Sequence, residues 1–239
     1  MSESVLPHPS NRILAALPPA DLQRLWPSLK PIELPFRQSV QKPGVPIAAV
    51  HFIESGFVSM VVMLQDGNGA EVGLVGPEGM LGLPLLYGTD RADIEGIVQH
   101  TGIALQLDAD SFAEALEWSP VLRRELLLYA MAHLQQVART AACNGRHHTE
   151  QRLARWLLMA HDRADGDRFA ITHELLSMML GVRRAGVTVA AGSLQRAGLI
   201  RYERGQLEIT SRHGLEAASC ECYAAVLQEA QRLAGHSGR

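Results

Sequence analysis

Two adjacent arginines, Arg183 and Arg184, stand where their side chains could read DNA. They follow Gly181, which separates two stretches, residues 172–180 and 184–197, with apolar residues at three-to-four spacing. Such spacing indicates two amphipathic helices, and a glycine between them accepts the positive φ of a tight turn. A guanidinium group can donate two parallel hydrogen bonds to guanine or to a phosphate. The segment therefore predicts a helix-turn-helix whose second helix opens on base-reading arginines in its first turn.

The residues that follow predict a β-hairpin behind this second helix. Residues 199–202 are β-prone, residues 206–209 alternate apolar and polar side chains, and Arg204-Gly205 favours a tight turn between them. A helix-turn-helix followed by a β-hairpin is a winged helix. The candidate DNA-contacting residues are Arg183, Arg184, Thr188, Gln195, Arg201 and Arg204. Without the hairpin, residues 172–197 would also fit an ordinary amphipathic helical hairpin.

Charge is distributed unevenly along the 239 residues, whose formal net charge is −3. Residues 1–145 carry 9 basic and 15 acidic side chains, whereas residues 146–212 carry 11 arginines and 7 acidic side chains. The basic excess coincides with the segment that would have to neutralise DNA phosphates. Three of these arginines precede the predicted helix-turn-helix, and we expect them to lie on a helix surface: Arg152, Arg155 and Arg163.

Residues 45–107 have the pattern of an antiparallel β domain. Short β-rich runs alternate there with ten glycines, which favours a β-roll or sandwich over a parallel sheet. Ser119-Pro120 then supplies a capping side chain and a first-turn proline, and no helix breaker follows before Asn144-Gly145. We expect an α+β chain with a β-roll at residues 1–118, a dimerisation helix and hinge at 119–145, and a winged-helix domain with a C-terminal tail at 146–239.

A narrow apolar seam follows the long helix. Its members alternate at spacings of three and four, as where two helices pack together. The seam consists of Leu127, Ala130, Leu134, Val137 and Ala141. A two-fold DNA reader needs a dimer axis, so we expect the seam to pair two chains. Packing of the helix on its own β domain, with Leu128 and Met131 contributing, is the alternative.

The composition excludes several classes of protein. No run approaches the roughly 18 uncharged apolar residues of a membrane span, and the first residues lack the basic and apolar regions of a signal peptide. Three cysteines, Cys143, Cys220 and Cys222, are too few for a disulfide scaffold. The Cys220-x-Cys222 pair has no second pair to complete a zinc site, and a redox role for it is a minor alternative. We therefore expect a cytoplasmic protein without a metal site or membrane contact.

The order of β-roll, long helix and winged helix resembles the catabolite-activator and fumarate-nitrate-regulator (Crp/Fnr) family of bacterial transcription regulators. The resemblance covers roughly residues 11–212. It is carried by residues 79–82 (GMLG) and 88–91 (GTDR) in the β-roll, and by residues 181–187 (GVRRAGV) in the reader. It implies a cyclic-nucleotide-binding-like β-roll that senses an effector, a homodimer, and a palindromic site in double-stranded promoter DNA. RNA polymerase is a further implied partner.

The helix-turn-helix contains only some of the residues that the family uses to contact DNA. Arg184 falls where the family's base-reading arginine begins the recognition helix. The acidic and basic readers that often follow are here Ala185 and Val189, so the base preference must differ from that of the catabolite activator. Gly186 replaces a usual hydroxyl residue, which removes a phosphate contact and costs the helix about 1 kcal/mol relative to Ala.

The effector residues depart further from the family pattern. The matching positions are Gly82, Leu83, Arg91 and Ala92. Members that bind cyclic AMP hold the ribose with a glutamate and the cyclic phosphate with an Arg-Ser pair, whereas this chain has Leu83 and Arg91-Ala92. One of three anchors remains, so we expect an effector other than cyclic AMP. Arg91 could instead pair on the surface with Asp90 or Asp93.

Two cofactor-based sensing mechanisms also fit poorly. An oxygen-sensing iron–sulfur cluster needs about four cysteine thiolates near the sensor, and the sequence has none before Cys143. A haem would need an axial ligand such as His51 or His100, which we expect to be ordinary strand residues. No cofactor is predicted.

Two other classes of protein remain as alternatives. An enzyme would use Cys143 with His147 or His148, or the glycines at 73, 76 and 79 as a phosphate loop. The cysteine and histidines lack an oriented third partner, and the glycines match neither known phosphate-loop motif, so no catalytic residue is predicted. The second alternative is a nucleotide-sensing regulatory subunit that does not bind DNA. A sequence-specific shift of promoter DNA would distinguish it from a regulator.

Overall fold

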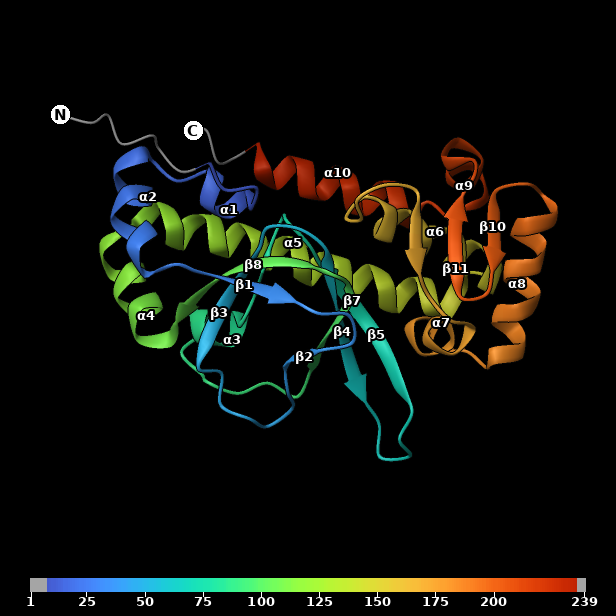
Figure 1. Ribbon diagram of the computed structural model, residues 1–239, viewed down its shortest axis with the longest axis horizontal. Coiled ribbons are helices and arrows are strands. Elements are labelled where there is room, and N and C mark those ends of the chain that lie inside the picture. The colour runs from blue at the N-terminus through green and yellow to red at the C-terminus, as the bar shows by residue number, and fades with distance from the viewer. Residues whose placement is uncertain (1–7, 236–239) are drawn as a thin grey trace.

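The chain folds into a β-roll, a long helix and a winged helix, in that order along the sequence (Figure 1). The structure is a computed structural model that describes residues 8–235. The predicted fold class is thereby confirmed. The strands of the β-roll are β1 (Lys30–Leu34), β2 (Ser39–Gln41), β3 (Ala49–Ile53), β4 (Phe57–Met63), β5 (Gly69–Val75), β6 (Met80–Leu81), β7 (Glu95–His100) and β8 (Gly102–Asp108).

Within the described residues these strands form two four-stranded antiparallel sheets, in the orders β1-β8-β3-β6 and β2-β7-β4-β5. Phe52 of β3 lies opposite Leu105 of β8, and Ser59 of β4 lies opposite Ile97 of β7. Buried side chains from both sheets, among them Phe52 and Val98, share one core with the start of the long helix. The many short runs and turn glycines thus close a roll.

Short helices cover the ends of the roll. They are α1 (Arg12–Ala15), α2 (Pro19–Leu25), the 3-10 turn η1 (Trp26–Ser28), α3 (Leu83–Leu86) and α4 (Ala109–Trp118). Asn11 caps α1 through its side-chain oxygen. Its side-chain nitrogen donates to the carbonyl oxygens of Ile53 and Gly79, at 2.9 and 2.8 Å. This buried amide therefore fixes the N-terminal helices to the β-roll.

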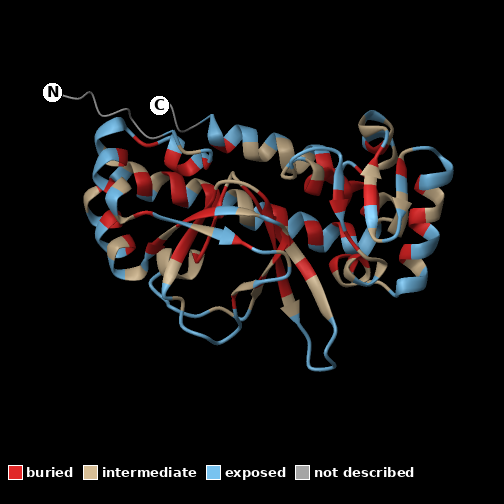
Figure 2. Ribbon diagram, viewed as in Figure 1, coloured by how far each residue is buried: buried red, intermediate tan, exposed pale blue. Residues whose placement is uncertain are grey.

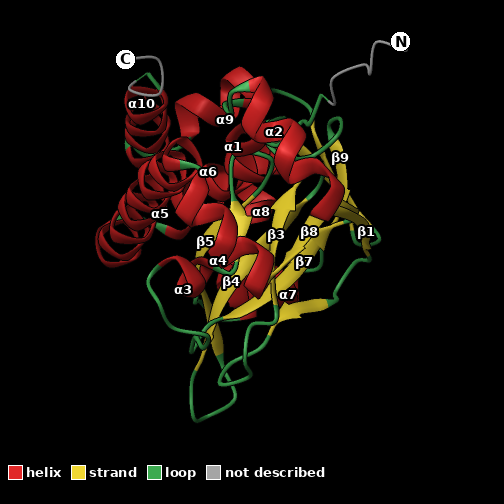
Figure 3. Ribbon diagram, turned by 90° about the vertical axis from the view of Figure 1, so that its left-hand side faces the viewer, coloured by secondary structure: helices red, strands yellow, loops and turns green. Residues whose placement is uncertain are grey.

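The long helix α5 (Pro120–Arg146) begins where the sequence predicts. The hydroxyl of Ser119 accepts a hydrogen bond from the Leu122 amide at 3.1 Å, which makes Ser119 the N-cap. The helix continues through Asn144-Gly145, where the sequence predicts a break, and ends at Arg146. The C-terminal tail contains a helix that the sequence analysis did not predict, α10 (Cys222–Ala234), which lies alongside α5 (Figures 1 and 3).

The winged helix follows α5. Its elements are α6 (Thr149–His161), β9 (Arg168–Ala170), α7 (His173–Leu180), α8 (Arg184–Arg196), β10 (Ile200–Glu203), β11 (Gln206–Ile209) and α9 (Arg212–Ala218). The predicted hairpin is present as β10 and β11, and β9 adds an unpredicted third strand beside β11. Among the described helices, none is long and apolar enough to cross a membrane.

The expectation that Arg152, Arg155 and Arg163 lie on a helix surface is wrong. Arg152 and Arg155 are only 7% and 5% exposed, and Arg163 forms an ion pair with Glu78 of the β-roll at 2.7 Å. The physical reason is that α6 is central in its domain and is buried over most of its length (Figure 2). These arginines therefore serve packing and domain contacts.

The winged helix packs against the β-roll of the same chain. Phe57, Val61 and Leu74 from β4 and β5 belong to one buried cluster with Trp156 of α6. Helix α7 also lies against β5, and the amide nitrogen of Gln99 on β7 lies 3.9 Å from the sulfur of Met179. The winged helix is thus held against the β-roll by an apolar contact.

Candidate DNA interface and effector cavity

The turn between α7 and α8 has the geometry that the sequence predicts. Gly181 ends α7 with φ of 58°, in the left-handed region that glycine accepts without steric cost. The amide of Val182 donates to the Ser177 carbonyl at 3.0 Å, which closes the end of α7. Arg184 is the first residue of α8, whereas Arg183 is the N-cap just before it. The prediction that both arginines lie in the first helical turn is therefore wrong for Arg183 by one residue.

One face of α8 is buried and the opposite face is open. Val187 is fully buried. Arg184 and Ala185 are exposed, and Val189 is 70% exposed. The hydroxyl of Thr188 donates to the Arg184 carbonyl at 3.1 Å, so its own helix already occupies that donor. The free face thus presents a cation beside two small apolar side chains.

Gln195 has a structural contact that the sequence does not reveal. Its side-chain oxygen accepts a hydrogen bond from the Tyr202 amide at 2.7 Å. This contact ties the end of α8 to the first strand of the wing. Only the amide nitrogen of Gln195 stays available for a phosphate.

The wing carries its basic side chains at and near the tip. Arg204 and Gly205 form the turn between β10 and β11 with φ of 50° and 79°, as a tight hairpin with two left-handed residues requires. Arg204 is exposed, and it forms no ion pair with the residues that the structure describes. Arg201, in contrast, pairs with Glu208 at 3.2 Å.

The long helix α5 presents three different faces. One face packs on β5 and a second packs on α10. The third is open and carries large apolar side chains: Leu127, Met131 and Leu134 are 50%, 46% and 60% exposed.

Not all of the predicted seam lies on this open face. Ala141 is exposed, but Val137 is half-buried, and Ala130 is only 6% exposed because it faces the β-roll. Ala130 is therefore not available to a partner in this arrangement. Met131, which the alternative of packing on the helix's own β domain would have used, lies on the open face.

A cavity of about 420 Å³ lies between the β-roll and α5. Its lining includes Leu83, Ala92, Tyr129, His133 and Leu134, and among the described residues no Asp, Glu, Lys or Arg side chain contributes to it. The Nδ1 atom of His133 is buried there without a hydrogen-bond partner among the described residues. Burial lowers the pKa of His133 to about 4, so the imidazole is neutral at pH 7.

The other candidate sensor residues lie apart from this cavity or have partners. Arg91 is on the surface, where it lies 3.7 Å from Asp90 and donates to the Gly44 carbonyl at 2.9 Å. His51 lies 3.2 Å from the Gln106 side-chain nitrogen, and His100 stacks on Phe57 with ring centroids 6.0 Å apart. The one anion anchor left from the family pattern is thus not among the residues that line the cavity.

The structure also joins residues that the sequence analysis kept separate. Cys143 and His147, at the end of α5, lie beside Cys220 and Cys222, before and at the start of α10. The signal in the sequence was the spacing of four between Cys143 and His147, which places both at one side of a helix end. The expectation of no metal site rested on the absence of a second pair beside Cys220 and Cys222, and Cys143 with His147 lies there.

Comparison with known proteins supports the same class. Residues 151–218 match the Crp-like helix-turn-helix domain family. Over 182 residues the chain is 25% identical to the transcriptional regulator SdrP of Thermus thermophilus. This match covers 73% of this chain and 86% of SdrP.

Solved structures give the same fold. FixK2 from Bradyrhizobium japonicum has a TM-score of 0.68 at 17% identity and covers 80% of this chain and 98% of its own. A Crp/Fnr family regulator from Eubacterium rectale has a TM-score of 0.69 at 15% identity, with 87% and 98% covered. The resemblance to the Crp/Fnr family is therefore confirmed. Residues 151–218 form a Crp-like helix-turn-helix domain, and the chain has the fold of Crp/Fnr transcription regulators.

Proposed function

We propose that the chain acts in the cytoplasm as a homodimer that binds a palindromic promoter site and responds to an uncharged, largely apolar effector. The observation that carries the DNA-binding part is the free face of α8. Arg184 begins the helix there, at the end that enters a major groove, and it has a small apolar neighbour at Ala185.

Each exposed residue of this face has a distinct role. Arg184 donates to a base edge, with guanine as the partner that suits two parallel donors. Val189 contacts a thymine methyl group, which is the apolar feature of the major groove. Arg183, just before the helix, contacts a phosphate or shares the base edge. Arg204 at the wing tip holds the backbone beside the groove.

The homodimer follows from the open face of α5. Leu127, Met131 and Leu134 together expose a large apolar stripe on a helix whose other faces are already covered. Such a stripe on a long helix fits a second copy of the same helix across a two-fold axis. The two winged helices of the dimer would then bind DNA half-sites that lie one or more turns of the double helix apart.

The cavity supports an effector that differs from cyclic AMP. A cyclic phosphate would need a cation, and the lining has none. Leu83 and Ala92 add apolar surface where the family's nucleotide binders have polar groups. The free Nδ1 of neutral His133 offers one hydrogen bond to an effector. Because Leu134 lines the cavity and is also on the open face of α5, an occupied cavity would alter the dimer contact and hence the spacing of the readers.

A selection of random double-stranded DNA by the purified full-length chain, followed by sequencing, tests the proposal. The expected product is a motif with two-fold symmetry that the chain retards as a dimer. A regulator of this type would then alter transcription by RNA polymerase from a promoter carrying that motif. Recovery of no enriched sequence would instead favour a regulatory subunit without DNA binding.

A further inference from the structure

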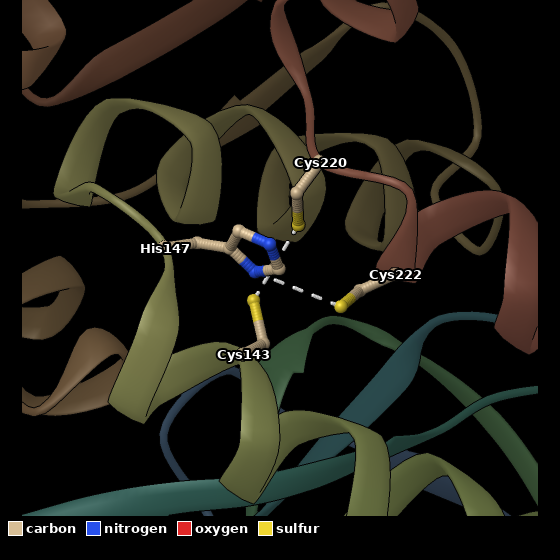
Figure 4. Close-up of side chains that lie close together, drawn as sticks. All are labelled: Cys143, His147, Cys220 and Cys222. Carbon is tan, nitrogen blue, oxygen red and sulfur yellow. Dashed lines mark hydrogen bonds between the residues drawn. The ribbon is translucent and has the colours of Figure 1, made fainter.

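Four side chains with metal-binding atoms converge at the junction of α5, α6 and α10. They are Cys143, His147, Cys220 and Cys222, and their nearest ligand atoms all lie within 4.8 Å of one another. The sulfur atoms of Cys143 and Cys220 are 3.5 Å apart, and the Cys222 sulfur is 3.7 Å from His147 Nδ1. Figure 4 shows the three thiols directed toward the imidazole ring.

These separations fit a tetrahedral metal ion. Zinc binds thiolate sulfur at about 2.3 Å and imidazole nitrogen at about 2.0–2.1 Å, which places neighbouring ligand atoms roughly 3.5–3.8 Å apart. The Cys143–Cys220 and Cys222–His147 separations, 3.5 and 3.7 Å, agree with this range, and all four ligand atoms lie within 4.8 Å of one another. Three sulfurs and one imidazole nitrogen are also a donor set that zinc prefers over harder cations.

We propose that Cys143, His147, Cys220 and Cys222 bind one zinc ion. On binding, the three thiols release their protons to solvent and coordinate as thiolates, while the neutral imidazole coordinates through Nδ1. All four positions are filled by protein atoms, so the site has no open coordination position for a substrate. It is therefore a structural site.

The side chain next to the ligands supports this assignment. The other ring nitrogen of His147, Nε2, lies 3.3 Å from a carboxylate oxygen of Glu221. A carboxylate in this place accepts a hydrogen bond from the Nε2–H group, which leaves Nδ1 free to bind the metal. Glu221 stands between two of the ligands in the sequence, so the same short segment supplies thiolates and the positioning carboxylate.

The charge around the cluster is also suited to thiolates. Three thiolates and a divalent ion leave one net negative charge. Arg152 and Arg155 are buried close enough to Cys143 to interact with it electrostatically. Neither forms an ion pair with a carboxylate among the described residues, and the Nε atom of each is without a partner there. The single negative charge of a zinc–thiolate centre would offset one of these two buried positive charges.

The zinc site would connect the winged helix and α10 to the long helix α5. Cys143 is in the last turn of α5 and His147 is its C-cap, at the hinge that leads into α6. Cys220 comes from the segment that joins α9 to α10, and Cys222 is the first residue of α10. One ion therefore connects the hinge with the C-terminal helix, which fixes α10 along α5.

Metal analysis of the purified full-length chain tests this proposal. We expect one zinc ion per chain, with X-ray absorption giving three sulfur neighbours at about 2.3 Å and one nitrogen at about 2.0–2.1 Å. Cys220→Ser and His147→Ala should lose the metal. His148→Asn is the matched control, since the neighbouring histidine is exposed and asparagine preserves a helix cap. Glu221→Gln should retain the stoichiometry but bind about 10–100-fold more weakly.

Zinc titration of the metal-stripped wild-type chain makes the test independent of whether the variants fold. Zinc should slow hydrogen exchange in α10, because the ion ties the start of that helix to the hinge. Wild-type protein that neither contains zinc nor takes it up in competition with a micromolar chelator would overturn the proposal. A disulfide between Cys143 and Cys220 in the protein as purified would overturn it as well, in favour of a redox pair.

Discussion

The indole nitrogen of Trp156 in α6 donates a hydrogen bond of 2.8 Å to the buried carboxyl group of Glu71 in β5. The hydroxyl of Ser59 lies 2.5 Å from the other carboxyl oxygen. Burial raises the pKa of Glu71 to about 8, although both hydrogen bonds and the nearby Arg155 and Arg163 act in the opposite direction. Glu71 is thus protonated in the folded chain at pH 7, and it links the sensor to the reader.

The first prediction concerns pH. The pKa of Glu71 is higher in the folded chain than its usual value of 4.5, so folding takes up a proton. Its contribution to stability is complete below that value and is lost as pH rises through about 8. Relative to Glu71→Gln, the free energy of unfolding of the wild type should therefore fall with pH by up to about 1.4 kcal/mol per unit.

Urea unfolding of both proteins at several pH values measures this difference. Burial lowers the pKa of His51 and His133 to about 4, which makes stability rise with pH in the acid range. Both histidines are present in both proteins, so their effect cancels in the comparison. Parallel stability curves for the two proteins would show that Glu71 is ionised in the folded chain.

The second prediction concerns Gly79, where the ring of Tyr129 lies against the backbone. A Cβ atom at Gly79 would lie 2.2 Å from that ring, whose hydroxyl donates to the Met80 carbonyl at 3.3 Å. Gly79→Ala should lower the free energy of unfolding by about 1–3 kcal/mol, as overpacking does. Gly145→Ala is the control, because nothing lies near its Cβ and alanine favours helix by about 1 kcal/mol. Equal effects of both changes on thermal unfolding would contradict the close packing at Gly79.

The third prediction concerns assembly. Leu134→Glu would place two like charges across the proposed two-fold axis, which should cost several kcal/mol of dimer stability. Gln135→Glu adds the same charge one residue further on, where the helix faces the α10 side, and should leave the dimer intact. Light scattering at micromolar concentration measures both. A monomeric wild type would refute the proposed dimer, whatever the variants do.

The fourth prediction concerns the effector. Cyclic AMP at millimolar concentration should cause no large shift in Tm, because the cavity has no cation for the cyclic phosphate. A ligand at 100 times its Kd would add about 2.7 kcal/mol to the free energy of unfolding, an easily measured shift. Saturable stabilisation by cyclic AMP at micromolar concentration would show that the cavity binds nucleotides after all.

The sequence was most informative where the structure depends on local patterns. Gly181 and the arginines after it predicted the helix-turn-helix because turn geometry and amphipathic spacing involve only neighbouring residues. Ser119-Pro120 located the start of α5 for the same reason. The hairpin turn at Arg204-Gly205 was likewise a local signal.

Features that depend on tertiary contacts were missed or misassigned. Three-to-four spacing could not separate the open face of α5 from the face on the β-roll, so Ala130 joined the seam and Met131 did not. The burial of Arg152 follows from the position of α6 between neighbouring elements. The cysteine cluster forms only because α10 returns to α5, a contact between residues about 77 positions apart in the chain.

The last prediction separates base reading from backbone contact. Arg184 is exposed at the start of α8, which is the part of a recognition helix that reaches base edges. Arg204 is exposed at the tip of the wing, where phosphates are within reach. Arg184→Ala should therefore weaken binding to the selected operator by about 1–3 kcal/mol and relax the preference at one or two base positions.

Arg204→Ala is the matched control because it removes the same side chain from a position without base contact. It should weaken binding to all sequences alike and reduce the salt dependence of the affinity by about one phosphate contact. Competition binding against a library of operator variants at two salt concentrations measures both effects. If Arg184→Ala left affinity and sequence preference unchanged, the assignment of Arg184 as the base-reading residue, and with it the proposed placement of α8 in the groove, would be wrong.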